Sequence, residues 1–351
     1  MIEIDGSYGE GGGQILRGAT FLACVTRTPL RVYNIRARRP KPGLQPQHLV
    51  GLKAAAQVSG ATLEGADIGS CEIRFYPGTT TGGSFSFEIG TAGSTMLVAQ
   101  ELIPILAFAE EASEVRITGG TDVPWSPPAD YFRNVAVPAF KIIGIETAVE
   151  LLRRGHFPKG GGEVWISVSP VRELRAVMAV ERGKVESVRG ISHCTNLPAN
   201  IAYRQASSAE RALRRAGYSE IRILTEAGTN PTGGPGSGIV LWAETGTGFR
   251  VGADALGSRE RRAEEVGNLA ARKLLEELQS GMALDSHLAD MLIPLTALAN
   301  GFSKIGVSKI TPHSETMIWL CSKFLGSSFE VESLKGGGAV VKVEGKPPSR
   351  M

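Results

Sequence analysis

Hydrophobic residues recur along this chain at two spacings, and each spacing predicts one type of secondary structure. Leu102 is followed three and four residues later by Ile105 and Leu106, which places all three on one face of a helix. Phe85 and Phe87 alternate with serine, as in a strand with one buried face. Elements of both kinds follow one another along the whole chain, so we predict an α+β fold built from α/β repeats.

The predicted elements come in the order strand, helix, strand, helix, strand, strand, and this order then recurs. In the first copy they cover residues 2–5, 14–26, 30–35, 45–58, 62–64 and 72–76. In the second copy they cover residues 84–89, 94–110, 114–118, 128–142, 146–152 and 163–168. Corresponding elements lie about 80 to 90 residues apart, which indicates an internal repeat of the βαβαββ type.

A third copy closes the chain and is interrupted by an insertion. Its elements are predicted at residues 173–180, 286–298, 302–307, 313–324, 328–331 and 339–343. The intervening segment has its own strands and helices, at 185–191, 201–216, 220–225, 239–243, 249–252 and 260–278, with an irregular Gly- and Pro-rich loop at 228–238. We therefore predict a large three-repeat domain, residues 1–180 and 282–351, and a small inserted α/β domain, residues 181–281.

Composition and charge limit the classes of protein to which the chain can belong. Its 351 residues, 42% hydrophobic and 21% charged, predict a folded chain of roughly two domains. A formal net charge of +3 is too small for general attraction to nucleic acid, so any basic site must be local. The four cysteines form no CxxC pair, and the chain contains neither a long apolar stretch nor a signal-peptide core. We expect reduced thiols and a soluble, cytoplasmic protein.

A glycine-rich segment, GSYGEGGGQ at residues 6–14, connects the first strand to the first helix. Glycines allow backbone amides to face a ligand, and a helix N-terminus attracts anions. Glu10 is the one acid among them and suits a metal ion beside a phosphate. A similar turn at 90–94 opens the helix that carries Gln100. Both segments are equally compatible with tight turns that have no ligand.

A basic loop, IRARRPKPG at residues 35–43, follows the second predicted strand and precedes Gln47 and His48. Guanidinium groups bind phosphates through two parallel hydrogen bonds, and the two prolines stiffen the loop. Arg17, on the first helix, can join this cluster. The alternative is a solvated loop without a ligand.

Two further segments contain side chains with possible chemical roles. Residues 119–131, GGTDVPWSPPADY, lead into a helix, and Tyr131 is an aromatic that can flank a base. His313, in TPHSET, follows a strand and starts a helix, where the helix N-terminus lowers the pKa of an imidazole. A neutral imidazole is a competent nucleophile toward phosphorus. A structural or surface role is the alternative for each.

Together these segments resemble one family, the RNA 3′-terminal phosphate cyclases. The similar motifs are DGSYGEGGGQILR (5–17), IRARRPKPGLQPQHL (35–49), GTAGSTMLVAQ (90–100), GGTDVPWSPPADY (119–131), HFPKGGGEV (156–164), HLADMLIPLTALA (287–299) and TPHSET (311–316). The resemblance extends in order over essentially the whole chain, although the inserted segment matches mainly by position and length. The family's fold, three βαβαββ repeats with a small insert, agrees with the repeats described above.

The resemblance implies an ATP-dependent ligase that converts an RNA 3′-phosphate into a 2′,3′-cyclic phosphodiester. A histidine attacks the α-phosphate of ATP, giving histidinyl-AMP and pyrophosphate. The RNA terminal phosphate then accepts AMP, and the neighbouring 2′-hydroxyl closes the ring and expels it. A phosphoanhydride provides the leaving group that a phosphate monoester lacks, and the 2′-hydroxyl is already in position.

The resemblance also implies a role for each matched residue. His313 is the nucleophile, and Glu10 contacts a divalent metal ion, Mg²⁺ or Mn²⁺. The nucleotide is contacted by Gln100, Pro127, Pro128, Tyr131, Phe249, His287 and Asp290. The terminal phosphate is bound by Arg17, Arg36, Arg39, Gln47 and His48. The implied partners are ATP and RNA with a 3′-terminal phosphate, with no membrane; the oligomeric state is left open.

Two other functions are compatible with parts of this pattern. One is a catalytically inactive cyclase-like protein of ribosome biogenesis, against which the presence of His313, Glu10 and the arginines counts. The other is an enolpyruvyl transferase, which needs neither a nucleophilic histidine nor the insert. Within the cyclase interpretation, the basic loop can contact the triphosphate of ATP instead of the RNA end.

Overall fold

Three four-stranded sheets in the computed structural model share one strand order, and the structure describes residues 1–348. The first sheet contains β1 (Ile2–Asp5), β2 (Leu30–Tyr33), β4 (Ile73–Tyr76) and β3 (Thr62–Glu64), in that order. β1 and β2 are parallel, whereas the other neighbours are antiparallel. A parallel pair requires a crossover, and α1 (Gly13–Thr26) provides it.

The other two sheets repeat this arrangement of one parallel and two antiparallel pairs. The second has the order β5 (Gly83–Glu88), β6 (Ser113–Gly119), β8 (Gly162–Val168) and β7 (Thr147–Arg153). The third has the order β10 (Met178–Ala179), β16 (Phe302–Val307), β18 (Ala339–Glu344) and β17 (Phe329–Ser333). The predicted α+β class is therefore confirmed.

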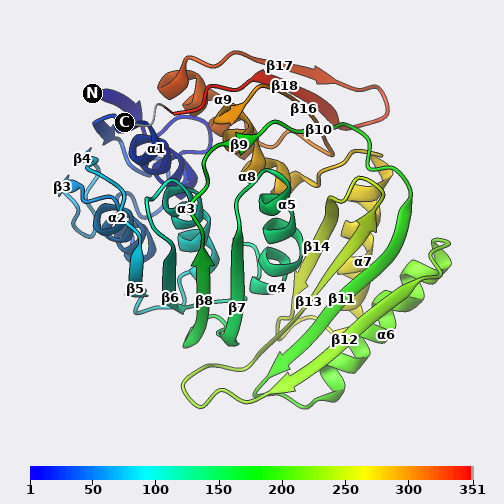
Figure 1. The fold of residues 1–351 in the computed structure, drawn as a ribbon. Helices are drawn as coiled ribbons and strands as arrows, with labels where there is room; N and C mark the ends of the chain where they lie inside the picture. Colours follow the sequence, from blue (N-terminus) through cyan, green and yellow to red (C-terminus); the bar gives the residue numbers. More distant parts are fainter. Residues whose placement is uncertain (349–351) are drawn as a thin grey trace.

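Helices fill the space between the three sheets (Figure 1). The crossover helices α1, α3 (Thr95–Ala107) and α8 (Ser286–Ala297) are almost entirely buried, whereas α2 (Pro46–Val58) and α9 (Pro312–Leu325) are more exposed. α1 packs against α2, α3 and α9, and α8 also packs against α9. The N-terminal end of α9 is thereby held beside α1 and α8.

The predicted helix at 128–142 is wrong as a single α-helix. The structure divides it into α4 (Ala129–Tyr131), a π-helical turn η1 (Phe132–Ala136) and α5 (Val137–Ile142). Pro138 has no backbone N–H and its ring would clash with the carbonyl group four residues earlier, so the backbone widens before it. The single strand predicted at 173–180 is likewise two short strands, β9 (Leu174–Arg175), which pairs with β15 (Ala299–Asn300), and β10.

Residues between β10 and α8 form a fourth sheet with its own helices. Its order is β12 (Ile221–Gly228), β11 (Val185–Thr195), β13 (Gly236–Thr245) and β14 (Arg250–Leu256), and α6 (Asn200–Arg215) and α7 (Ala263–Gln279) pack on it. The loop predicted at 228–238 is shorter than expected, because residues 236–238 pair with the end of β11. β13 and β14 also contact α4, and β14 contacts η1, so this unit lies against the second sheet's helices (Figure 1).

All four cysteines, Cys24, Cys71, Cys194 and Cys321, are free thiols, as expected. Within residues 1–348, every helix is too short or too polar to span a bilayer.

Candidate active site

The glycine-rich loop after β1 brings Glu10 to the start of α9. Gly9 and Gly11 have φ angles of 56° and 59°, which residues with a Cβ rarely adopt. The Tyr8 ring stacks on Trp319 of α9, with ring centroids 4.0 Å apart. A tight glycine turn and one aromatic contact therefore fix the loop to a helix that lies about 300 residues later in the sequence.

His313 lies in the first turn of α9, where sequence analysis placed it. Thr311 caps this helix, because its hydroxyl accepts a hydrogen bond from the backbone N–H of Ser314. The Nε2 atom of His313 lies 3.3 Å from Oε2 of Glu10. The side chain of Gln14 donates a hydrogen bond to the backbone carbonyl of His313. The imidazole is half exposed, so a substrate can reach it.

Asp290 of α8 holds the start of α9 in place. One carboxylate oxygen accepts hydrogen bonds from the hydroxyls of Thr311 and Ser314, each at 2.6 Å. The other oxygen lies 3.7 Å from Nδ1 of His313. Asp290 is buried and lies on the Nδ1 side of the imidazole. The opposite nitrogen, Nε2, therefore faces Glu10 and solvent.

The expected lowering of the His313 pKa is wrong. The hydrogen-bonding interaction with Asp290 is the largest influence, and with the negative charges of Asp290 and Glu10 it raises the pKa. These effects outweigh burial and the positive charge of Arg17, which act in the opposite direction. Two carboxylates beside the ring thus dominate over the helix N-terminus.

A cavity of about 40 Å³ lies behind Asp290, between α1, α3 and α8. Its polar lining consists of Gln14, Arg17, Gln100, Glu101 and Asp290. Burial lowers the pKa of Arg17 to about 10 and raises that of Glu101 to about 8. At neutral pH Glu101 is largely protonated, so the charged groups of the lining are the Arg17 guanidinium and the Asp290 carboxylate.

The basic loop lies next to Glu10. The guanidinium of Arg39 is 3.7 Å from the Glu10 carboxylate, and that of Arg36 donates to the backbone carbonyl of Lys41 at 3.1 Å. The Nε atoms of Arg36 and Arg39 are buried and have no hydrogen-bond partner among residues 1–348. Buried N–H groups without partners are uncommon, and an anion at this position would satisfy them.

Gln47 and His48 lie at the start of α2, beside the same loops. Nδ1 of His48 accepts a hydrogen bond from the backbone N–H of Gln45, and Nε2 lies against Gly13, where a Cβ would come within 2.3 Å of it. Burial, with a smaller effect of Arg17, lowers the pKa of His48 to about 3, so this ring is neutral. The side chain of Gln47 accepts a hydrogen bond from the backbone N–H of Ser94.

The predicted nucleotide contacts fall into two groups. His287 is exposed in the first turn of α8, on the helix that carries Asp290, and Gln100 lines the cavity. Pro127 and Pro128 precede α4, in which Tyr131 is buried and donates a hydrogen bond to Asp285 at 2.6 Å. Phe249 is also buried, in the core shared by the inserted unit and the large body. The roles of these six residues and of Asp290 in nucleotide binding remain predictions.

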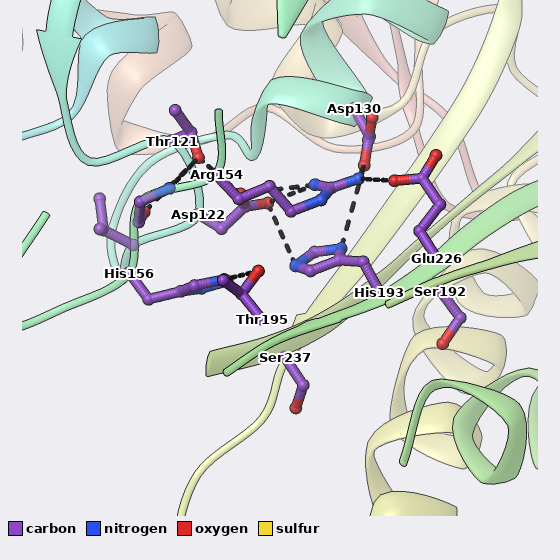
Figure 2. Close-up of polar contacts among 12 residues, drawn as sticks. Thr121, Asp122, Asp130, Arg154, His156, Ser192, His193, Thr195, Glu226 and Ser237 are labelled. Carbon is purple, nitrogen blue, oxygen red and sulfur yellow. Dashed lines mark hydrogen bonds and ion pairs between the residues drawn. The ribbon is translucent and has the colours of Figure 1, made fainter. Parts of the chain in front are cut away.

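One polar cluster was not predicted from the sequence. Asp122, Arg154, His156 and His193 are buried together where the inserted sheet meets the second sheet (Figure 2). Two of these residues lie inside the quoted motifs, but no spacing in the sequence connects them to His193 on β11.

Comparison with known proteins shows the family to which the chain belongs. A family model described as RNA 3′-terminal phosphate cyclase matches residues 8–331. An RNA 3′-terminal phosphate cyclase of Staphylothermus marinus is 49% identical over 350 residues, or 98% of each chain. Another, of Thermococcus gammatolerans, is 50% identical over 97% of each chain. The enolpyruvyl transferase NikO of Streptomyces tendae overlaps 46% of this chain and 31% of its own at 16% identity and a TM-score of 0.27, too low to support any inference.

The fold and this site define a mixed α+β protein with a histidine, two carboxylates and a cluster of arginines at the junction of its first and third sheets. The chain belongs to the RNA 3′-terminal phosphate cyclase family.

Proposed function

We propose that this protein uses ATP to convert the 3′-terminal phosphate of an RNA into a 2′,3′-cyclic phosphodiester. One observation carries the proposal: the half-exposed Nε2 of His313 lies beside Glu10 and next to arginines whose buried Nε atoms have no partner. A nucleophile and an unfilled anion site are thus adjacent, as transfer between phosphates requires.

His313 is the nucleophile of the first step. Its Nε2 forms a bond to the α-phosphorus of ATP, the bond to the bridging oxygen breaks, and pyrophosphate leaves. The Asp290 carboxylate lies 3.7 Å from Nδ1, so it faces the ring from the side opposite Nε2 and stabilises the positive charge that develops on it. The RNA 3′-phosphate then takes AMP from the histidine, and the attack of the 2′-hydroxyl on that phosphate releases AMP.

Glu10 fits the requirements of a divalent cation that acts with a nucleotide. Mg²⁺ keeps several waters and is held by one or two carboxylates together with substrate phosphates, and Glu10 is an exposed carboxylate at the mouth of the site. Such an ion would neutralise phosphate charge during transfer. Glu10 also lies within 3.7 Å of Arg39 and 3.3 Å of His313, so it connects the anion site to the nucleophile.

The terminal phosphate is bound by Arg36 and Arg39, with Arg17, Gln47 and His48 completing the site. The buried Nε atoms without partners support this assignment, because each can donate to a phosphate oxygen. A terminal monoester has about −1.5 to −2 charge, more than an internal phosphodiester, so clustered guanidiniums distinguish an RNA end from the rest of the chain.

The nucleotide lies toward α8 and the inserted unit in this proposal. His287 and Gln100 are within its reach, and Pro127, Pro128, Tyr131 and Phe249 form the wall between the large domain, residues 1–180 with 282–351, and the insert, residues 181–281. The four free thiols agree with a reducing cytoplasm, where ATP and RNA are also found.

Incubation of the purified protein with Mg²⁺ and ATP labelled at the α-phosphate tests the proposal. A covalent AMP adduct that is labile to acid and stable to alkali is expected, and RNA with a 3′-phosphate should discharge it and gain a cyclic end. An inactive cyclase-like protein or an enolpyruvyl transferase would give no adduct, and that result would overturn the proposal.

A further inference from the structure

A buried polar cluster joins the inserted unit to the second sheet, away from His313. Asp122 follows β6, His156 follows β7, and His193 lies on β11, so three segments distant in sequence converge (Figure 2). All three side chains are at least 96% buried. The reaction proposed above assigns no role to any of them.

The geometry of the cluster is close to that of a metal site. One potential ligand atom from each of Asp122, His156 and His193 lies within 4.8 Å of the other two. Two ligands about 2.0–2.1 Å from a tetrahedral metal are about 3.3 Å apart. The Oδ1 atom of Asp122 and Nε2 of His193 are already 3.5 Å apart, so small side-chain rotations bring all three to a common ion.

An independent observation points to a missing ligand. Both ring nitrogens of His193 are buried and have no hydrogen-bond partner within residues 1–348. A buried imidazole without a partner is costly, because its polar atoms lose water and gain nothing in exchange. A cation between His193 and Asp122 would satisfy one of these nitrogens directly.

The second ring nitrogen of His193, Nδ1, faces a carboxylate, as is common for the nitrogen of a metal-binding histidine that does not contact the metal. Nδ1 lies 3.9 Å from Oδ2 of Asp130, and metal-binding histidines commonly donate their other N–H to a carboxylate. His156 has a polar neighbour as well, since its Nε2 is 3.3 Å from the hydroxyl of Thr195. Burial lowers the pKa of both rings, which favours the neutral imidazole that a metal ion binds.

The charges around the cluster also favour a cation. Arg154 is the one guanidinium that bridges the three carboxylates of Asp122, Asp130 and Glu226, at 3.5, 2.7 and 2.6 Å. Arg133 also pairs with Asp130, at 3.3 Å, so with all three carboxylates ionised two positive charges face three negative charges, and a cation would balance the remaining negative charge. Arg154 contacts the edge of the cluster toward Asp130 and Glu226 (Figure 2).

We propose that Asp122, His156 and His193 bind one divalent transition-metal ion of the kind that prefers imidazole and carboxylate ligands, such as Zn²⁺. The ion fastens β11 of the inserted unit to the loops after β6 and β7. This site is separate from the Glu10 site, which serves the nucleotide, and its role is to fix the insert rather than to take part in catalysis.

Metal counting on the full-length protein tests the site independently of the reaction. The chelator-treated protein is dialysed against Zn²⁺ and then against metal-free buffer, and bound zinc is measured by mass spectrometry. One ion per chain is expected in the wild type and in Glu10→Gln. Essentially none is expected in His193→Gln or in Asp122→Asn, which keeps the size of the side chain and an acceptor for the Thr121 hydroxyl.

Two further measurements make the outcome decisive. Co²⁺ in place of Zn²⁺ should give visible absorption bands from a four- or five-coordinate site, and saturating Zn²⁺ should raise the unfolding temperature of the wild type but not of Asp122→Asn. Far-ultraviolet circular dichroism verifies that the variants are folded; if His193→Gln is not, Asp122→Asn and the wild-type stoichiometry decide. A wild type that retains no zinc, or folded variants that retain as much as the wild type, would overturn the proposal.

Discussion

The Nε2 atom of His313 lies 3.3 Å from the Oε2 atom of Glu10, although His313 is in the first turn of α9 and Glu10 is in the loop between β1 and α1. Neither the glycine-rich loop nor α9 brings the two side chains together by itself. The stacked rings of Tyr8 and Trp319 bring the first loop to α9, and Asp290 fixes the start of that helix. The proposed chemistry therefore depends on packing between repeats rather than on any single segment of sequence.

Replacement of His313 by Ala should abolish the AMP adduct, by roughly 1000-fold or more, because the described site holds no other imidazole beside Glu10. His313→Asn should behave likewise, since an amide does not attack phosphorus. The side chain is half exposed, so the free energy of unfolding should change by less than about 1 kcal/mol. Gel analysis with labelled ATP measures the adduct.

His287→Gln is the matched control for the His313 variants. It removes another exposed imidazole, from the first turn of the neighbouring helix α8, and should weaken ATP binding while still allowing the adduct to form. A His313→Ala protein that is labelled as fully as the wild type would refute the assignment of the nucleophile.

The rate of adduct formation should rise with pH through a midpoint above 6.5. Only the neutral imidazole attacks, and Asp290, followed by Glu10, raises the pKa of His313. Below that pKa the neutral fraction falls about tenfold per pH unit, so acid slows the reaction. Asp290→Asn removes the largest cause and should move the midpoint downward, whatever it does to the maximal rate.

Glu10→Gln provides the comparison for this pH profile. Glu10 is a smaller influence on the pKa of His313 than Asp290, so its removal should lower the midpoint by less. Single-turnover rates at several pH values give the three midpoints. An unchanged or raised midpoint in Asp290→Asn would show that His313 is not the group that titrates.

Stability should depend on pH through Glu101, which is buried beside the cavity. Burial raises its folded-state pKa from 4.5 to about 8. Its contribution to the free energy of unfolding is therefore fully present below pH 4.5 and is lost as the pH rises through about 8. Glu101→Gln should therefore gain about 2 to 3 kcal/mol relative to the wild type between pH 6 and pH 9. Urea unfolding at both pH values measures this difference, and parallel pH dependence of the two proteins would contradict it.

The order of strands and helices follows from sequence where an element buries one face and so has a readable hydrophobic period, as the alternating strands β6 and β8 do. The π-helical turn at 132–136 does not follow in the same way: the apolar spacing continues through it, and the interruption comes from the backbone limits of Pro138. The hydrophobic pattern also did not predict where strands begin in the inserted sheet. Gly236 to Gly238 read as loop residues, yet pairing with β11 makes them a strand.

Site residues were predictable only where a motif contained them. Glu10 and His313 lie in such motifs, and their type and position suggest chemistry. The contact of Asp290 with Thr311 and Ser314 depends on how α8 meets α9, which no spacing in the chain encodes. The raised pKa of His313 has the same origin, since the carboxylates responsible lie on other elements.

Replacement of Arg39 by Ala should spare the first half-reaction and impair the second. The Arg39 guanidinium lies 3.7 Å from Glu10 and has a buried Nε without a partner, so in our proposal it grips the terminal phosphate of RNA. Losing such charge-assisted bonds costs about 1.5–3 kcal/mol, which slows AMP transfer to RNA by roughly 10- to 100-fold. RNA with a 3′-hydroxyl should bind no better to the wild type than to the variant. Single-turnover assays of adduct formation and of its discharge separate the steps: if Arg39→Ala blocks adduct formation and spares transfer from preformed adduct, the basic loop binds the triphosphate of ATP instead.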